Sequence, residues 1–205
     1  MHLFGRRDRR GSPIEWLVVG LGNPGEKYAR TRHNVGAESV ELLAERSGTK
    51  LRAGKDSALT AEVLLGADRT RSVLAFPLTY MNESGRSVSG LVRRYGIEHP
   101  EQIIVIHDEL DLEPGVLRLK SGGGLAGNNG LRSIAQHLKT QDFLRVRIGI
   151  GKPPNKERGG SHVLTRVPKR QRELLDVTIA EAADAVVDIV DHGIDAAMNT
   201  WHQRR

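Results

Sequence analysis

Short apolar runs and amphipathic stretches alternate along this chain. Runs rich in Val and Ile predict buried strands, most clearly at residues 16–19 and 102–106. Further strands are predicted at residues 61–65, 72–76, 116–120 and 143–150. Helical spacing and bounding Gly or Pro residues predict helices over residues 38–46, 87–95, 131–138 and 169–190. This alternation predicts an α/β fold in which helices cover one sheet.

The length and the N-terminal composition predict how the domain is organised. The chain has 205 residues, which suits one globular domain. Residues 1–13 carry four arginines, so we expect a basic flexible tail before a single domain over residues 14–205. No apolar run approaches the roughly 20 residues of a membrane helix, and the tail has no signal-peptide pattern. We therefore expect a cytoplasmic protein without membrane contact.

Composition excludes several chemistries. The chain contains no cysteine, so it cannot form disulfides, iron–sulfur clusters, thiolate zinc sites or a cysteine nucleophile. The motif G-x-S-x-G is also absent, which argues against an α/β serine hydrolase. Glycine is abundant, at 23 residues, and its clustering indicates tight backbone turns.

The segment Gly20–Gly25 fits the dinucleotide-binding pattern G-x-G-x-x-G and follows a predicted strand. In that pattern the third glycine lies in a helix whose N-terminus binds the pyrophosphate. Here Pro24 interrupts the turn, and the residues that follow lack an apolar helical stripe. We therefore reject NAD binding and expect the loop to present Asn23 at the end of a strand.

Polar side chains follow several predicted strands. Asn23, Asn82 and Asp108 come soon after apolar runs, and His33 follows the loop after the first strand. Because strand ends in one sheet converge, these side chains are expected to share a cleft. His33 is the natural general base, since an imidazole with a pKa near ~6.5 is mostly neutral at neutral pH. Asp108 would accept the other ring N–H and fix the tautomer.

Other interpretations of these residues remain open. His33 would equally serve as a structural or surface histidine, Asp108 as a turn cap and Asn82 as a helix N-cap. The acidic residues of His107–Asp111 would also suit a hard divalent metal. The sequence lacks H-E-x-x-H and cysteine, so it gives zinc little support.

Positive charge is concentrated in one part of the chain. The whole chain has a net charge of +6, while residues 114–160 contain nine basic residues and two acids. Strand periodicity places Arg118 with Lys120 on one face and Arg145 with Arg147 on one face. Such paired basic strands suit a phosphate backbone, although a solvated surface would carry the same pattern.

A set of segments in order resembles the bacterial peptidyl-tRNA hydrolase family. The segments are residues 18–25 (VVGLGNPG), Tyr28, residues 31–36 (TRHNVG), 80–85 (YMNESG), 107–111 (HDELD), 122–124 (GGG), 129–131 (NGL) and 147–151 (RIGIG). Together they cover roughly residues 15–200. The resemblance implies a monomeric three-layer α/β/α sandwich with a mixed, mostly parallel central sheet.

The resemblance also implies a reaction and a site. The expected activity is hydrolysis of the ester between a peptide and the 3′ end of tRNA, with no cofactor and no metal. The implied catalytic residues are His33 as the base, Asp108 as its orienting acid and Asn23 as a peptide contact. The implied substrate and tRNA contacts, around the 3′ end and the acceptor arm, are Tyr28, Tyr80, Asn82, Asn129, Arg118, Lys120 and Arg147.

One position departs from the family pattern. The family usually has histidine before the asparagine of the glycine-rich segment, where this chain has Asn128. We hypothesise that the site tolerates this change, because asparagine also donates and accepts hydrogen bonds.

Two rival functions are an RNA-binding relative that has lost catalysis and a metal-dependent phosphoesterase using His107, Asp108 and Asp111.

Overall fold

The computed structural model describes residues 13–153, 155 and 159–203, so nearly all of the predicted basic tail lies outside the described residues. These residues form one seven-stranded sheet with the order β2-β3-β4-β1-β5-β7-β6. The strands are β1 (Trp16–Gly20), β2 (Arg52–Ala53), β3 (Ala58–Leu65), β4 (Thr70–Pro77), β5 (Ile103–Glu109), β6 (Leu117–Ser121) and β7 (Leu144–Gly149). The α-helices are α1 (Val35–Arg46), α2 (Ser84–Tyr95), α3 (Asn129–Leu138), α4 (Gly159–Leu164), α5 (Lys169–His192) and α6 (Ile194–His202). Short 3-10 turns are η2 (Glu26–Tyr28), η3 (Arg32–Asn34), η4 (Met81–Glu83) and η5 (Pro100–Gln102).

The centre of the sheet is parallel. β1 pairs in parallel with β4 on one side and β5 on the other, and β7 pairs in parallel with β5. The outer pairings, β2 with β3, β3 with β4 and β6 with β7, are antiparallel. The α/β fold with a mixed sheet is confirmed, and the carboxyl ends of the four parallel strands meet at one edge.

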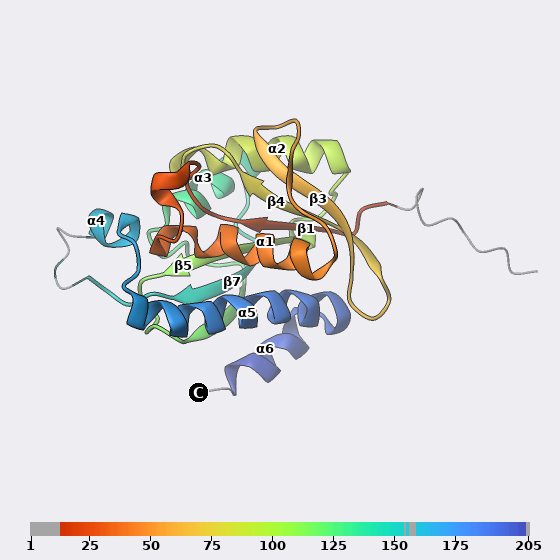
Figure 1. Ribbon diagram of the computed structural model, residues 1–205. Coiled ribbons are helices and arrows are strands. Elements are labelled where there is room, and N and C mark those ends of the chain that lie inside the picture. Colours follow the sequence, from red (N-terminus) through yellow and green to blue (C-terminus); the bar gives the residue numbers. More distant parts are fainter. Residues whose placement is uncertain (1–12, 154, 156–158, 204–205) are drawn as a thin grey trace, which may run out of the picture.

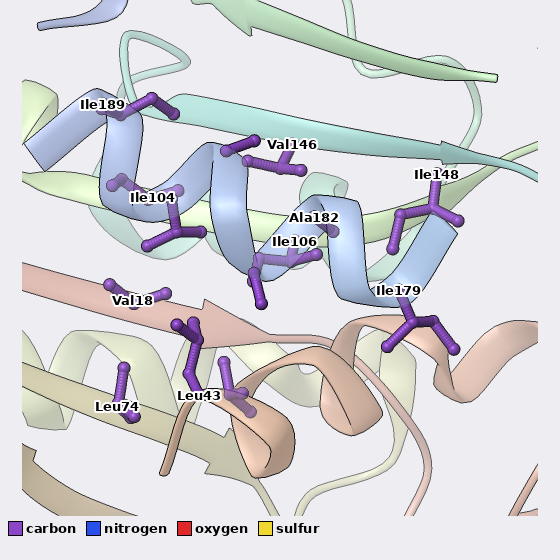
Figure 2. Packing of buried hydrophobic residues seen from close by; sticks show 14 of the residues in the cluster. Val18, Leu43, Leu74, Ile104, Ile106, Val146, Ile148, Ile179, Ala182 and Ile189 are labelled. Atoms are coloured by element: carbon purple, nitrogen blue, oxygen red, sulfur yellow. The ribbon is translucent and has the colours of Figure 1, made fainter. Parts of the chain in front are cut away.

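Helices cover both faces of the sheet. Figure 1 shows α1, α5 and α6 on one side and α2 and α3 on the other. Successive side chains of a strand point to opposite faces, so Val18 and Ile104 pack toward α1 and α5 (Figure 2). Leu17 and Val105 pack toward α2 and α3. Each fully buried aliphatic side chain of this kind contributes about 1.5–3 kcal/mol, so the two layers fix the sheet from both sides.

The predicted strands are present, but the helix limits differ. α1, α2 and α3 begin at Val35, Ser84 and Asn129, each earlier than the apolar spacing predicted. The 3-10 turns that precede α1 and α2 have only three residues each, so no apolar stripe marks where these helices begin. The last predicted helix ends at His192, because Gly193 has a φ of 82° and starts a separate helix, α6.

Gly36 allows the first turn of α1 to lie directly against the sheet. A Cβ at this position would overlap the carbonyl oxygen of Ile106 in β5. Because η3 immediately precedes α1, this close approach holds His33 above the carboxyl end of β5.

No helix in the described part of the chain has the length and apolar character needed to cross a membrane.

Candidate active site

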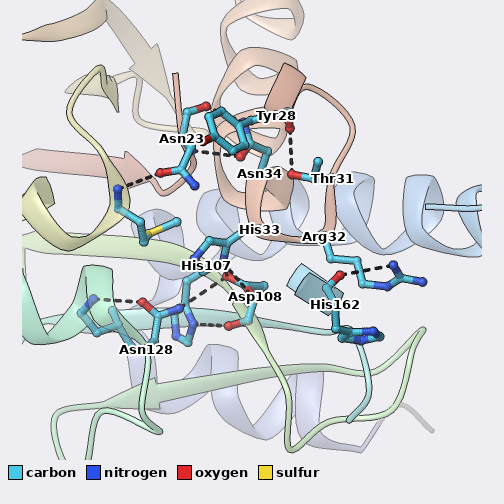
Figure 3. A network of polar contacts seen from close by, with 12 residues as sticks. Asn23, Tyr28, Thr31, Arg32, His33, Asn34, His107, Asp108, Asn128 and His162 are labelled. Carbon is cyan, nitrogen blue, oxygen red and sulfur yellow. Dashed lines mark hydrogen bonds and ion pairs between the residues drawn. The ribbon is translucent and has the colours of Figure 1, made fainter. Parts of the chain in front are cut away.

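His33 and Asp108 form the centre of the site (Figure 3). His33 Nδ1 lies 2.9 Å from each carboxylate oxygen of Asp108, and the two side chains are 12% and 3% exposed. An ionised carboxylate only accepts hydrogen bonds, so Nδ1 carries the hydrogen and Nε2 keeps its lone pair. Within the described residues, Nε2 has no hydrogen-bond partner. The pair thus has the geometry of a general base held by an acid.

Two opposing effects act on the His33 imidazole. Burial lowers its pKa, whereas the charge of Asp108 and the hydrogen bond to it raise it. The attraction of the carboxylate outweighs burial, so the pKa of His33 lies above its ordinary value. Asp108 therefore makes His33 a stronger base than a buried histidine without a partner.

His107 is adjacent in sequence but has a different environment. It is 1% exposed, and its Nδ1 donates to the backbone carbonyl of Asp108 at 2.8 Å. Burial lowers the pKa of His107 and favours its neutral form. Asp111 is exposed and pairs with Lys152 at 2.9 Å. His107, Asp108 and Asp111 therefore do not form a shared ligand set, and no group of three potential metal ligands occurs among the described residues.

Asn23 is held in one orientation by the first residue of η4. Its side-chain Oδ1 accepts from the backbone N–H of Met81 at 2.8 Å. Its backbone is fixed by Asn34, whose Oδ1 and Nδ2 bind Asn23 N and O at 2.9 Å each. The amide nitrogen of Asn23 is therefore the group left to donate, and Figure 3 shows it on the side of His33. The positioning role of Asn34 was not predicted, because nothing in a Thr-Arg-His-Asn turn identifies a contact with Asn23.

Asn128 reaches the His33–Asp108 pair from the other helix layer. Its Oδ1 accepts from the backbone N–H of Leu131 at 3.1 Å and caps α3. Its Nδ2 lies 3.4 Å from Asp108 Oδ1, within hydrogen-bond distance. Asn128 therefore both donates and accepts a hydrogen bond at the position where the resemblance implies a histidine, and its tolerance there stays a hypothesis.

The predicted substrate contacts Tyr80, Asn82 and Asn129 are exposed, and Tyr28 is half-buried. Tyr80 is 57% exposed, and the ring of Tyr28 lies 4.7 Å from the Lys27 ammonium. The interaction with Tyr28 raises the pKa of Lys27, and Tyr80 adds to this shift. Asn82 is exposed on η4 and caps no helix, and Asn129 is exposed at the start of α3. Their side chains are accessible to a ligand.

The predicted basic face is present, with one correction. Arg118 pairs in register with Arg147, and Lys120 pairs with Arg145, so all four share one face of the sheet. Arg118 and Lys120 are half-buried, and Arg147 Nε donates to Glu109 Oε2 at 3.2 Å. Arg145 is only 1% exposed and binds backbone carbonyls. Strand periodicity therefore places Arg145 on this face correctly, but its guanidinium is buried and is not exposed with the other three bases.

Comparisons with known proteins place this chain in a family. The model of the Peptidyl-tRNA hydrolase family matches residues 17–205. A peptidyl-tRNA hydrolase from Mycolicibacterium gilvum is 50% identical over 187 residues, covering 91% of this chain and 96% of that protein. The crystal structure of peptidyl-tRNA hydrolase from Acinetobacter baumannii has a TM-score of 0.83 and 44% identity, covering 92% of this chain and 96% of that one. This chain belongs to the peptidyl-tRNA hydrolase family.

Proposed function

We propose that the protein hydrolyses the ester bond between a peptide, or an N-blocked aminoacyl group, and the 3′ end of tRNA, which releases tRNA for reuse in translation. Family membership supports this reaction. The observation that carries the mechanism is the 2.9 Å contact between His33 Nδ1 and the Asp108 carboxylate, which leaves Nε2 as the basic atom.

The proposed steps follow from that geometry. His33 Nε2 takes a proton from water as the water oxygen attacks the ester carbonyl carbon. Asp108 stabilises the imidazolium that forms. The tetrahedral intermediate then expels the 3′ oxygen of the terminal ribose, and the imidazolium returns its proton to that oxygen. An ester has a good leaving group, so one base, one orienting acid and amide donors for the oxyanion suffice without a cofactor.

Asn23 supplies selectivity in this proposal. Met81 N–H occupies its Oδ1, so Asn23 presents an N–H donor to the substrate. A blocked or peptidyl group offers a carbonyl oxygen to that donor, whereas a free aminoacyl group offers an ammonium, which cannot accept. A donor left unpaired beside a cation disfavours the free aminoacyl-tRNA strongly.

The remaining predicted residues would bind the rest of the substrate. Tyr28, Tyr80, Asn82 and Asn129 would contact the peptidyl and 3′-terminal parts, and Arg118, Lys120 and Arg147 would meet phosphates of the acceptor arm. In this proposal the catalytic unit is a single domain over residues 14–205 that acts as a monomer in the cytoplasm, where translation takes place.

The reaction is tested by release of N-acetyl-aminoacyl groups from tRNA in the presence of EDTA. We expect the purified protein to cleave the blocked form without added metal and to leave free aminoacyl-tRNA intact. Loss of cleavage in EDTA, restored by a divalent cation, would favour the metal-dependent phosphoesterase. Tight binding of tRNA without any cleavage would favour the RNA-binding relative.

The basic face predicts a salt dependence. Replacing Arg118 and Lys120 together with alanine removes two phosphate contacts, so the slope of log Kd against log salt should flatten by up to about two units. The measurement is tRNA binding over a salt series. The matched control replaces Lys50 and Arg93, two exposed bases outside β6 and β7, and should keep the wild-type slope. An unchanged slope in the Arg118 and Lys120 double variant would place the tRNA elsewhere.

A further inference from the structure

Arg145 is a buried cation bound to main-chain oxygens. It is 1% exposed, although it lies on the same face as the basic residues Lys120 and Arg147. Its Nη1 donates to the carbonyl of Gly124 at 2.6 Å, and its Nη2 donates to the carbonyl of Gly123 at 2.7 Å and to that of Gly122. A guanidinium offers this planar fork of donors, whereas the lysine ammonium is a compact point charge.

These carbonyls belong to the glycine-rich loop, residues 122–127, which joins β6 to α3. Gly122 and Gly123 have φ values of 59° and 77°, in the left-handed region that favours glycine. This backbone path lets consecutive carbonyls turn toward one guanidinium. The glycines and Arg145 therefore form one structural unit, although more than 20 residues separate them in sequence.

The far end of this loop lies in the active site. The loop ends at Gly127, and the next residue, Asn128, caps α3. Its Nδ2 lies 3.4 Å from Asp108 Oδ1. Asp108 in turn holds the ring of His33. We propose that Arg145 is a positioning residue for ester hydrolysis. Its hydrogen bonds to the glycine-rich loop fix the path of the loop and so hold Asn128 in contact with Asp108. This inference rests on the proposed function.

The alternative role for Arg145 is to attract tRNA, since it carries a positive charge and pairs in register with Lys120. Burial lowers the pKa of Lys120, and the charges of Arg145 and Arg147 lower it further, so these cations do interact. The two roles predict different activities for a protein with lysine at position 145. Lysine keeps the charge but cannot hold three carbonyls in a fork, so it separates positioning from attraction.

The experiment measures kcat and KM for N-acetyl-aminoacyl-tRNA with Arg145→Lys and Arg145→Met. Positioning predicts that kcat falls about 10- to 100-fold in both variants, with a smaller change in KM. The salt slope of tRNA binding should stay at the wild-type value even in Arg145→Met, which removes the charge, because Arg145 makes no phosphate contact. The matched control is Arg93→Lys, an exposed position on α2, which should keep wild-type kcat. Wild-type kcat in Arg145→Lys would overturn the inference.

A double-variant cycle tests the path and separates it from loss of folding. Asn128→Ala alone should lower kcat, and adding Arg145→Lys should lower it little further, because both changes release the same contact with Asp108. Losses that multiply would overturn the inference. Thermal denaturation of each variant confirms that kcat is measured on folded protein.

The inference and the proposed function fail in different ways. If the wild-type protein shows no turnover, the proposed function fails, and Arg145 is then tested by hydrogen exchange of backbone amides. Faster exchange in Arg145→Lys that is confined to residues 122–131 supports control of the loop by Arg145. Unchanged exchange there overturns it.

Discussion

Replacing His33 with alanine is expected to lower kcat by about 10²- to 10⁴-fold, the usual contribution of a general base. His33 is the histidine whose Nδ1 is bound by Asp108 while its Nε2 lacks a hydrogen-bond partner in the described structure. tRNA binding should change little, because Arg118 and Lys120 lie on β6. The measurement is single-turnover cleavage of N-acetyl-aminoacyl-tRNA together with tRNA affinity at one salt concentration.

Two further variants make this result specific. His33→Ala leaves the buried carboxylate of Asp108 without its imidazole partner, which lowers stability as well as activity. In His33→Gln the amide still donates to Asp108 but cannot take a proton from water, so the same loss of kcat is expected in a more stable protein. His192→Ala removes an exposed histidine and should keep full activity. Full activity in both His33 variants would remove His33 from the mechanism.

The sequence predicts the parts of this fold that depend on local pattern. Strand β5 begins with an unbroken run of Ile and Val at residues 103–106, and β6 alternates apolar and basic residues, so both follow from local pattern. The beginning of α1 does not follow from local pattern. The turn that precedes it is polar, and Gly36 lies so close to β5 that a side chain there would overlap the strand. The short helix α4 contacts η3 through the bond from Arg32 to the carbonyl of His162, and no local pattern predicts a contact between segments so far apart in sequence.

The candidate site shows the same division. His33, Asp108 and Asn23 were predicted from their places after strands, and the structure brings them together across more than 80 residues of sequence. Asn34 was not predicted, because its two bonds to the Asn23 backbone depend on how the loop folds back. Strand alternation placed Arg145 on the correct face of the sheet, but it could not show that the glycine-rich loop covers Arg145 there.

Replacing Asp108 with asparagine is expected to lower kcat by about 10²- to 10⁴-fold through the His33 tautomer. The aspartate only accepts and therefore keeps the hydrogen on Nδ1, whereas an asparagine amide also donates to Nδ1 and stabilises the tautomer with the hydrogen on Nε2. In that tautomer Nε2 cannot accept a proton from water. The matched control is Asp111→Asn, which removes an exposed carboxylate paired with Lys152 and should retain activity.

The same variant makes a prediction about pH with a definite sign. His33 acts as a base only when neutral, so kcat/KM of the wild-type protein should rise with pH through the pKa of His33. Because the Asp108 charge and hydrogen bond outweigh burial, that midpoint should lie above the ordinary histidine pKa of about 6.5. Asp108→Asn removes the charge and leaves burial, which lowers the pKa, so the midpoint should move to lower pH even as the plateau falls. A midpoint that stays in place would show that Asp108 does not control the base.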